Sequence, residues 1–399
     1  MKDLKIFTNN IEDKALEQIN TLLEQDAFKE CKVRIMPDVH AGAGCVIGFT
    51  ANLGDKVTPN LIGVDIGCGM TWYNTGLKEI NFEKLDKFIH DNIPSGMNVN
   101  ENEYTVPLDL EDLYCYNELR NKDRYLQRSL CSLGGGNHFI EVDKADDGDL
   151  YLVIHSGSRN LGKQVCEIYQ DKAIKHCSFD NELKEEKEKA IKTLKEQGKQ
   201  NLIQPTLKEI ENKYKGKTKL PKDLCYIEGD DRDDYLHDMK WCQNWASFNR
   251  LYMLEKICMF LGVDFNLSEV NETIHNYIDS ENMARKGAIR AMKDEMVLIP
   301  INMRDGCIIG KGKGNPDWNY SAPHGAGRIM SRMEAKRTLS VKDFQDSMSG
   351  IFTTTANEIT IDEAPMAYKP MQEIIENIKD TVDVIKIIKP VYNFKAEEK

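Results

Sequence analysis

The sequence lacks the features that would place the protein in a membrane or outside the cell. No apolar run approaches the roughly 18 residues that a bilayer-spanning helix needs. The first residues, Met-Lys-Asp-Leu, show no basic segment followed by an apolar one. The eleven cysteines are odd in number and include no Cys-x-x-Cys pair, unlike a secreted disulfide framework. We therefore expect a soluble, cytoplasmic protein with reduced thiols and no membrane partner.

Fixed-period repeats, low-complexity tracts and Pro/Gly/Ser linkers are also lacking in the 399 residues. This favours one large α+β domain over 1–399, with mixed β-sheets and flanking helices. Short apolar runs beside glycine-rich turns predict strands at 33–36, 45–49, 61–64 and 151–154. Apolar spacing predicts a buried helix over 234–261, helices after Gly327 and near 341–349, and an amphipathic stretch over 371–388. The Lys/Glu-rich segment 178–222 is interpreted as a charged helical insertion within the domain.

The net charge of −12 argues weakly against a nucleic-acid partner. The charge is uneven, however, because residues 284–337 contain eleven Lys or Arg and only five Asp or Glu. A phosphate backbone responds to the local potential, so this basic segment weakly favours RNA.

Histidine is scarce, and five of the eight histidines lie in short motifs with glycine, asparagine, serine or arginine. A histidine buried for packing alone would have apolar neighbours. The five are His40, His138, His155, His275 and His324.

Two glycine-rich motifs combine metal-ligand side chains with tight turns. In Gly63–Gly69, Asp65 and Cys68 lie three residues apart, and a thiolate can bridge two metal ions. Taken alone, this motif is more often a turn that buries a cysteine and is capped by an aspartate. In Leu133–Glu141, three glycines precede Asn137 and His138, so backbone N–H groups could face a phosphate.

The other motifs add a histidine each. His155 follows a predicted strand, and Arg159 could fork onto two phosphate oxygens. His275 begins a predicted helix, where a structural role is the commoner one. His324 lies on a glycine turn before a predicted helix, whose N-terminus would favour an anion beside a nucleophilic imidazole. Together these side chains indicate a two-metal centre for phosphorus chemistry, with zinc or manganese favoured.

The motifs taken in order resemble the RtcB family of RNA-splicing ligases. The matching segments cover nearly the whole chain outside the charged insertion. They are MPDVHAGAGCVIG (36–48), GVDIGCG (63–69), LGGGNHFIEV (133–142), IHSGSRNLG (154–162), the block 273–287, PHGAGRIMSR (323–332), DEAPMAYK (362–369) and KPVYNFK (389–395).

The resemblance implies a GTP-dependent enzyme that joins an RNA 3′-phosphate or 2′,3′-cyclic phosphate to a 5′-hydroxyl end. It implies two Mn²⁺ ions, with Zn²⁺ or Co²⁺ as alternatives, and a possible archease-like activator. Cys68 would bridge the metals, with Asp65 and His138 at one and His155 and His275 at the other. His324 would carry GMP. Asn137, Glu141, Arg328 and Lys395 would contact the nucleotide, and His40, Arg159 and Arg285 are candidate RNA or phosphate contacts.

Two segments depart from the family pattern. Ala41 and Ala43 stand where many members have Gln and Tyr, and Ile301-Asn302-Met303 replaces a common Gly-Ser-Met turn. The departures fit a divergent subgroup specialised for RNA repair rather than tRNA splicing, and the biological substrate stays open between the two. Two other functions compete: a two-metal phosphoesterase, which would not need His324, and an inactive RNA-binding or scaffold protein, which would have lost metal ligands.

Overall fold

A seven-stranded sheet forms the centre of the protein in the computed structural model, which describes residues 3–397 apart from the side chains at positions 123 and 124. Its strand order is β11-β12-β14-β5-β6-β4-β7, and all neighbouring pairs are antiparallel. The strands are β4 (Gly69–Asn74), β5 (Phe139–Ala145), β6 (Leu150–Ser156), β7 (Asn271–Ile274), β11 (Met296–Asn302), β12 (Gly306–Gly312) and β14 (Val382–Lys395).

Two smaller sheets complete the β-structure. The five-stranded sheet has the order β1-β2-β3-β9-β8, and β10 pairs with β13. These strands are β1 (Leu4–Ile6), β2 (Val33–His40), β3 (Ile47–Asn52), β8 (Asn276–Ile278), β9 (Met283–Lys286), β10 (Ala288–Arg290) and β13 (Ser321–Pro323). The architecture is therefore the expected α+β fold.

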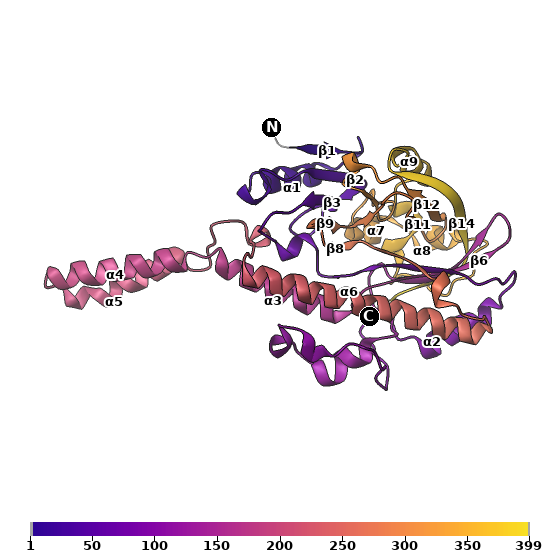
Figure 1. Cartoon of the computed structure of the whole chain (residues 1–399), viewed down its shortest axis with the longest axis horizontal. Coiled ribbons are helices and arrows are strands. Elements are labelled where there is room, and N and C mark those ends of the chain that lie inside the picture. The colour runs from indigo at the N-terminus through magenta and orange to yellow at the C-terminus, as the bar shows by residue number, and fades with distance from the viewer. Residues whose placement is uncertain (1–2, 398–399) are drawn as a thin grey trace.

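Nine α-helices accompany the sheets in the described part of the chain, and the longest, α6, contacts β4, β6 and α3. Figure 1 shows α6 running beneath the sheets. The helices are α1 (Asp13–Leu23), α2 (Phe82–Asn92), α3 (Asn160–His176), α4 (Asp180–Glu196), α5 (Ile203–Tyr214), α6 (Asp230–Leu261), α7 (Arg332–Thr338), α8 (Val341–Ser347) and α9 (Met371–Asn377). Within residues 3–397, no helix is both long and apolar enough to traverse a bilayer.

The charged segment 178–222 contains α4 and α5, which project away from the body as a paired arm (Figure 1). Ion pairs between Lys187 and Glu211 and between Lys213 and Glu186 join the two helices. At the base of the arm the Lys219 N–H donates to the Cys177 carbonyl at 2.9 Å. The chain thus leaves and re-enters the body at one place. That the arm is an insertion within one larger domain stays a prediction.

Most predicted elements are confirmed, and three expectations need correction. Strands β2, β3 and β6 and helix α6 overlap their predicted ranges. The strand predicted at 61–64 is wrong, because positive φ angles at Gly63 and Gly67 turn the backbone there. The helix predicted from His275 is also wrong, since that residue lies between β7 and β8. The stretch 371–388 divides into α9 and the start of β14, because pairing with β12 makes its second half extended.

Candidate metal centre and adjoining pocket

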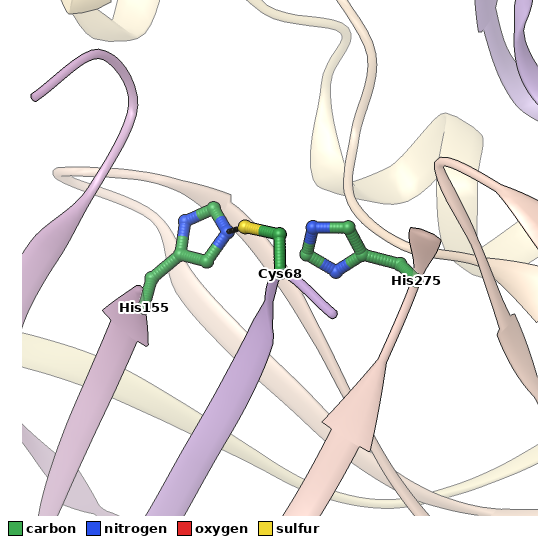
Figure 2. Close-up of side chains that lie close together, drawn as sticks. All are labelled: Cys68, His155 and His275. Carbon is green, nitrogen blue, oxygen red and sulfur yellow. Dashed lines mark hydrogen bonds between the residues drawn. The ribbon is translucent and has the colours of Figure 1, made fainter. Parts of the chain in front are cut away.

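Strand register brings three predicted metal ligands to one end of the central sheet. Gly69, which follows Cys68, pairs with Ser156 on β6 and with Ile274 on β7. His155 precedes Ser156, and His275 follows Ile274. The register therefore sets Cys68 between the two histidines, as Figure 2 shows.

The Cys68 thiol is close to two imidazole rings. Its Sγ lies 3.3 Å from His155 Nε2 and 3.5 Å from His138 Nε2. His275 completes a group with Cys68 and His155 in which one ligand atom from each residue lies within 4.8 Å of the others. All three side chains are buried.

A second group of ligand atoms shares the same thiol. Asp65, Cys68 and His138 also offer atoms within 4.8 Å of one another, and Asp65 Oδ2 lies 3.1 Å from His138 Nε2. Gly157 packs against the Asp65 carboxylate so closely that a Cβ there would overlap it. Any side chain at this position of the HSGSR motif would therefore displace the Asp65 carboxylate.

Hydrogen bonds at Nδ1 orient the His138 and His155 rings so that Nε2 faces the Cys68 thiol. His138 Nδ1 lies 2.8 Å from the Leu133 carbonyl, and His155 Nδ1 lies 3.2 Å from the Asn137 carbonyl. Each carbonyl accepts from an Nδ1–H, so each Nε2 presents a lone pair. This is the usual preparation of metal-binding histidines.

The donor set fits two divalent cations that share a thiolate. His275 Nδ1 and Asp65 Oδ1 are buried and have no hydrogen-bond partner within the described part of the chain. Burial lowers the pKa of His155 and His275 well below the ordinary value, and neighbouring histidines lower it further. Neutral imidazoles are the form that binds metal. Burial and the Asp65 charge raise the pKa of the Cys68 thiol, so thiolate formation needs a compensating cation.

Helix α6 holds the turns that carry these ligands. The Arg250 guanidinium donates to the Gly67 carbonyl at 2.9 Å and to the Ser156 carbonyl at 2.7 Å, and it pairs with Glu272. The neighbouring Asn249 donates to the Gly157 carbonyl. Sequence reasoning missed both residues. A signal was available in the sequence: Asn249 and Arg250 are consecutive polar residues within a helix that was predicted to be buried.

His324 lies beside the metal-ligand group, with its ring centroid 4.7 Å from that of His275. A helix after Gly327 is confirmed by α7, which begins at Arg332. That helix start lies eight residues beyond His324, which directly follows β13, so the helix N-terminus is not beside this imidazole. The imidazole is held instead by the fully buried Asp38, whose Oδ2 lies 2.6 Å from Nδ1 and also accepts from the His324 backbone N–H. Asp38 was missed as a site residue, although it lies in the MPDVH motif.

A pocket adjoins the metal-ligand group and contains all four residues predicted to contact a nucleotide. Its wall also includes His40, His155 and His324. Ile301 and Asn302, which differ from the family pattern, line it too. The four predicted residues are Asn137, Glu141, Arg328 and Lys395. Their nucleotide contacts stay predictions.

Glu363, which sequence reasoning did not single out, gathers the positive charges of this pocket. Its Oε2 lies 2.9 Å from Lys395 Nζ, and its Oε1 lies 3.3 Å from Arg328 and 3.4 Å from Arg332. Burial opposes ionisation, but these three cations outweigh it and lower the pKa of Glu363 to about 2. One wall of the pocket is thus a fixed group of ionised side chains.

The three candidate RNA contacts differ in their surroundings. His40 lines the pocket. Arg159 donates to the Gly96 carbonyl and to Ser132 Oγ, and Arg285 is buried and pairs with Asp279 at 2.7 Å. Contacts of these three residues with RNA stay predictions.

Comparisons of the sequence with known proteins identify its family. The sequence matches the family described as tRNA-splicing ligase RtcB over residues 25–119 and 116–396. The RNA-splicing ligase RtcB of Escherichia coli K12 is 28% identical over 437 residues, which cover 98% of this chain and 97% of that protein. The tRNA-splicing ligase RtcB of Aeropyrum pernix is 25% identical, with 86% and 83% covered. RNA-splicing ligase RtcB homolog 2 of Entamoeba dispar is 26% identical, with 88% and 78% covered.

The chain therefore belongs to the RtcB family of RNA-splicing ligases. Relatives at this similarity occur in bacteria, archaea and eukaryotes.

Proposed function

We propose that this protein is a GTP-dependent RNA ligase that joins a 3′-phosphate or 2′,3′-cyclic phosphate end to a 5′-hydroxyl end. A covalent GMP on His324 is the central intermediate. The supporting observation is the 2.6 Å contact between Asp38 Oδ2 and His324 Nδ1. Because the carboxylate accepts from Nδ1–H, the imidazole keeps its lone pair on Nε2 and can act as a nucleophile.

Two divalent cations, Mn²⁺ by family resemblance with Zn²⁺ or Co²⁺ as alternatives, would be held by the five clustered ligands. Asp65 and His138 would bind one and His155 and His275 the other, with Cys68 shared. When bound, the cations supply positive charge that offsets the charge of the reacting phosphates. The protein contributes the neutral rings, the fixed thiol and the exclusion of bulk water.

The pocket beside His324 would receive the guanylate. Arg328 and Lys395 provide fixed positive charge at its wall. Glu141 provides a carboxyl group that could accept from the N–H groups of guanine. Asn137 lines the pocket beside His155 and is a candidate phosphate contact.

The reaction requires three displacements at phosphorus. His324 Nε2 attacks the α-phosphorus of GTP, a P–N bond forms, and pyrophosphate leaves. An oxygen of the RNA 3′-phosphate then attacks the same phosphorus and releases the imidazole. Finally the 5′-hydroxyl attacks the 3′-phosphorus, loses its proton and displaces GMP. A cyclic phosphate must first be opened by water, because it lacks the monoester oxygen that accepts GMP.

The activating step explains the use of GTP. A 3′-phosphate monoester has no good leaving group, whereas its diphosphate with guanosine releases GMP. The substrates would be RNA ends produced by cleavage, in RNA repair or in tRNA splicing. An archease-like activator is a further proposed partner.

The deciding experiment is covalent labelling with GTP radioactive at the α-phosphate, in the presence of Mn²⁺. We expect wild type to take a label that is acid-labile and alkali-stable, and His324→Ala to take none. His90→Ala is the matched control, since His90 lies outside this pocket, next to Phe394 and Thr354. An unlabelled wild type with every divalent ion would contradict the ligase mechanism and favour phosphoester hydrolysis.

A further inference from the structure

A second group of metal-ligand side chains lies apart from the five clustered ligands. Glu141 and Asp143 lie on β5, and Cys307 lies on β12, with β14 between those strands. One ligand atom from each of the three residues lies within 4.8 Å of the others. Glu141 also lines the pocket, so the group adjoins the pocket wall.

This group contains buried oxygen atoms that accept no N–H or O–H hydrogen bond within the described chain. Asp143 is fully buried, and neither of its carboxylate oxygens has a hydrogen-bond partner among residues 3–397. The Glu141 carboxyl and the Cys307 thiol are neighbours that interact with it. Asn393, paired with Glu141 across β5 and β14, donates its amide to that carboxylate, while its own Oδ1 stays without a partner among the same residues.

The nearby Lys395 ammonium group already has other partners. Lys395 Nζ lies 2.9 Å from Glu363 and donates to the Asn137 carbonyl at 2.8 Å. Within residues 3–397, two carboxyl groups and a thiol are therefore buried together without a cation that pairs with them alone. Burying charges in this way is costly unless they are paired or bind a metal.

Protonation is the alternative to a bound ion. Burial raises the pKa of Glu141 to about 8 and that of Asp143 well above its ordinary value, so without an ion both carboxyls hold protons. The geometry favours an ion, because one ligand atom from each of the three residues already lies within 4.8 Å of the others. A divalent ion would draw on several of these acceptors at once.

We propose that Glu141, Asp143 and Cys307 hold a third cation, separate from the Cys68-centred pair. A thiolate with two carboxylates favours a borderline-soft ion of the zinc class over magnesium or calcium. An ion there would fix the Glu141 carboxylate at the pocket wall. This last consequence rests on the proposed function, whereas the site itself does not.

Metal content provides the first test. After equilibration with Zn²⁺ and removal of excess, we expect about three ions per wild-type chain and about two in Asp143→Asn. Asp86→Asn removes another buried carboxylate, one hydrogen-bonded by Thr354 and Tyr392, and should retain three. Equal metal content in wild type and Asp143→Asn, both folded by circular dichroism, would overturn the proposal.

Cobalt spectroscopy gives a second test that does not depend on Asp143 variants folding. In Cys68→Ser the shared thiolate of the main centre is absent, so a thiolate-to-cobalt charge-transfer band would have to come from another cysteine. We expect Co²⁺ to give this band in Cys68→Ser and to lose it in Cys68→Ser with Cys307→Ser. No band in the single variant would mean that Cys307 binds no metal. Both tests are independent of GMP transfer, so failure of the ligase proposal would leave their outcome unchanged.

Discussion

Asp38 Oδ2 contacts both Nδ1 and the backbone N–H of His324, at 2.6 and 3.1 Å. One fully buried carboxylate on β2 therefore fixes the ring and the main chain of a residue that lies far away in sequence. We therefore expect Asp38 to control the orientation and the tautomer of the proposed nucleophile, His324.

Asp38→Asn should slow GMP transfer to the enzyme by about 10²–10⁴-fold, because an amide no longer selects the tautomer with its lone pair on Nε2. Single-turnover labelling over a range of GTP concentrations measures this. We expect the maximal rate to fall with little change in the GTP concentration at half-saturation. Asp86→Asn is the control. An unchanged rate would mean that Asp38 has only a structural role.

Arg250→Met should weaken metal binding about 10–100-fold, because the carbonyls beside Cys68 and His155 lose their shared donor. It should also lower the free energy of unfolding by about 1–3 kcal/mol, because the Gly67 and Ser156 carbonyls lose a buried donor. Metal titration and urea unfolding measure the two effects. Arg232→Met, on the same helix, should leave metal affinity unchanged. Equal metal affinity in the two variants would contradict the role of Arg250.

Gly157→Ala should reduce metal affinity, because the added Cβ would displace the Asp65 carboxylate. Gly54→Ala is the matched control, since a Cβ there meets no described atom within 4 Å. Metal content after dialysis distinguishes them. Full retention of metal by Gly157→Ala would show that Asp65 can move without loss of the site.

Glu363 should make stability depend on pH in the acidic range. Burial opposes its ionisation, but Lys395, Arg332 and Arg328 lower the pKa of this carboxyl to about 2, against about 4.3 in an unfolded chain. The folded state therefore gains up to roughly 3 kcal/mol above pH ~4.3, and this gain is lost as the pH falls toward 2.

The comparison of wild type with Glu363→Gln tests this dependence. The difference in unfolding free energy, measured with urea, should be large at pH 6 and should shrink steadily toward pH 3.5. Glu334→Gln, at an exposed position on α7, should show no such trend. A wild-type advantage over Glu363→Gln that is independent of pH would contradict the assignment.

Replacing residues 180–217 by a short Gly-Ser linker should leave folding and GMP labelling intact. The arm is exposed, and the backbone already meets at its base between Cys177 and Lys219. Thermal melting and covalent labelling of the shortened chain measure this. Loss of the cooperative transition would mean that the arm is part of the domain core and not an insertion.

Much of the site could be predicted from short motifs. Asp65, Cys68, His138 and His155 stand beside glycines that permit tight turns, and those local patterns indicated metal ligands without a structure. His275 was also among the motif histidines, and the family resemblance assigned it to a metal ion, although its local structure was predicted wrongly. Apolar and polar spacing over 271–278 did not distinguish a helix from two short strands, and pairing with β4 and β9 decided it.

The sequence by itself determined which side chains could do the chemistry and which turns could present them, because residue type and local backbone freedom are short-range properties. Only the tertiary structure decided which groups act together. Asp38 meets His324, Arg250 joins the turns of Cys68 and His155, and Glu363 gathers three cations. Such contacts join residues far apart in the chain. Strand register and the packing of α6 create them, and no local pattern specifies which distant partner each residue will meet.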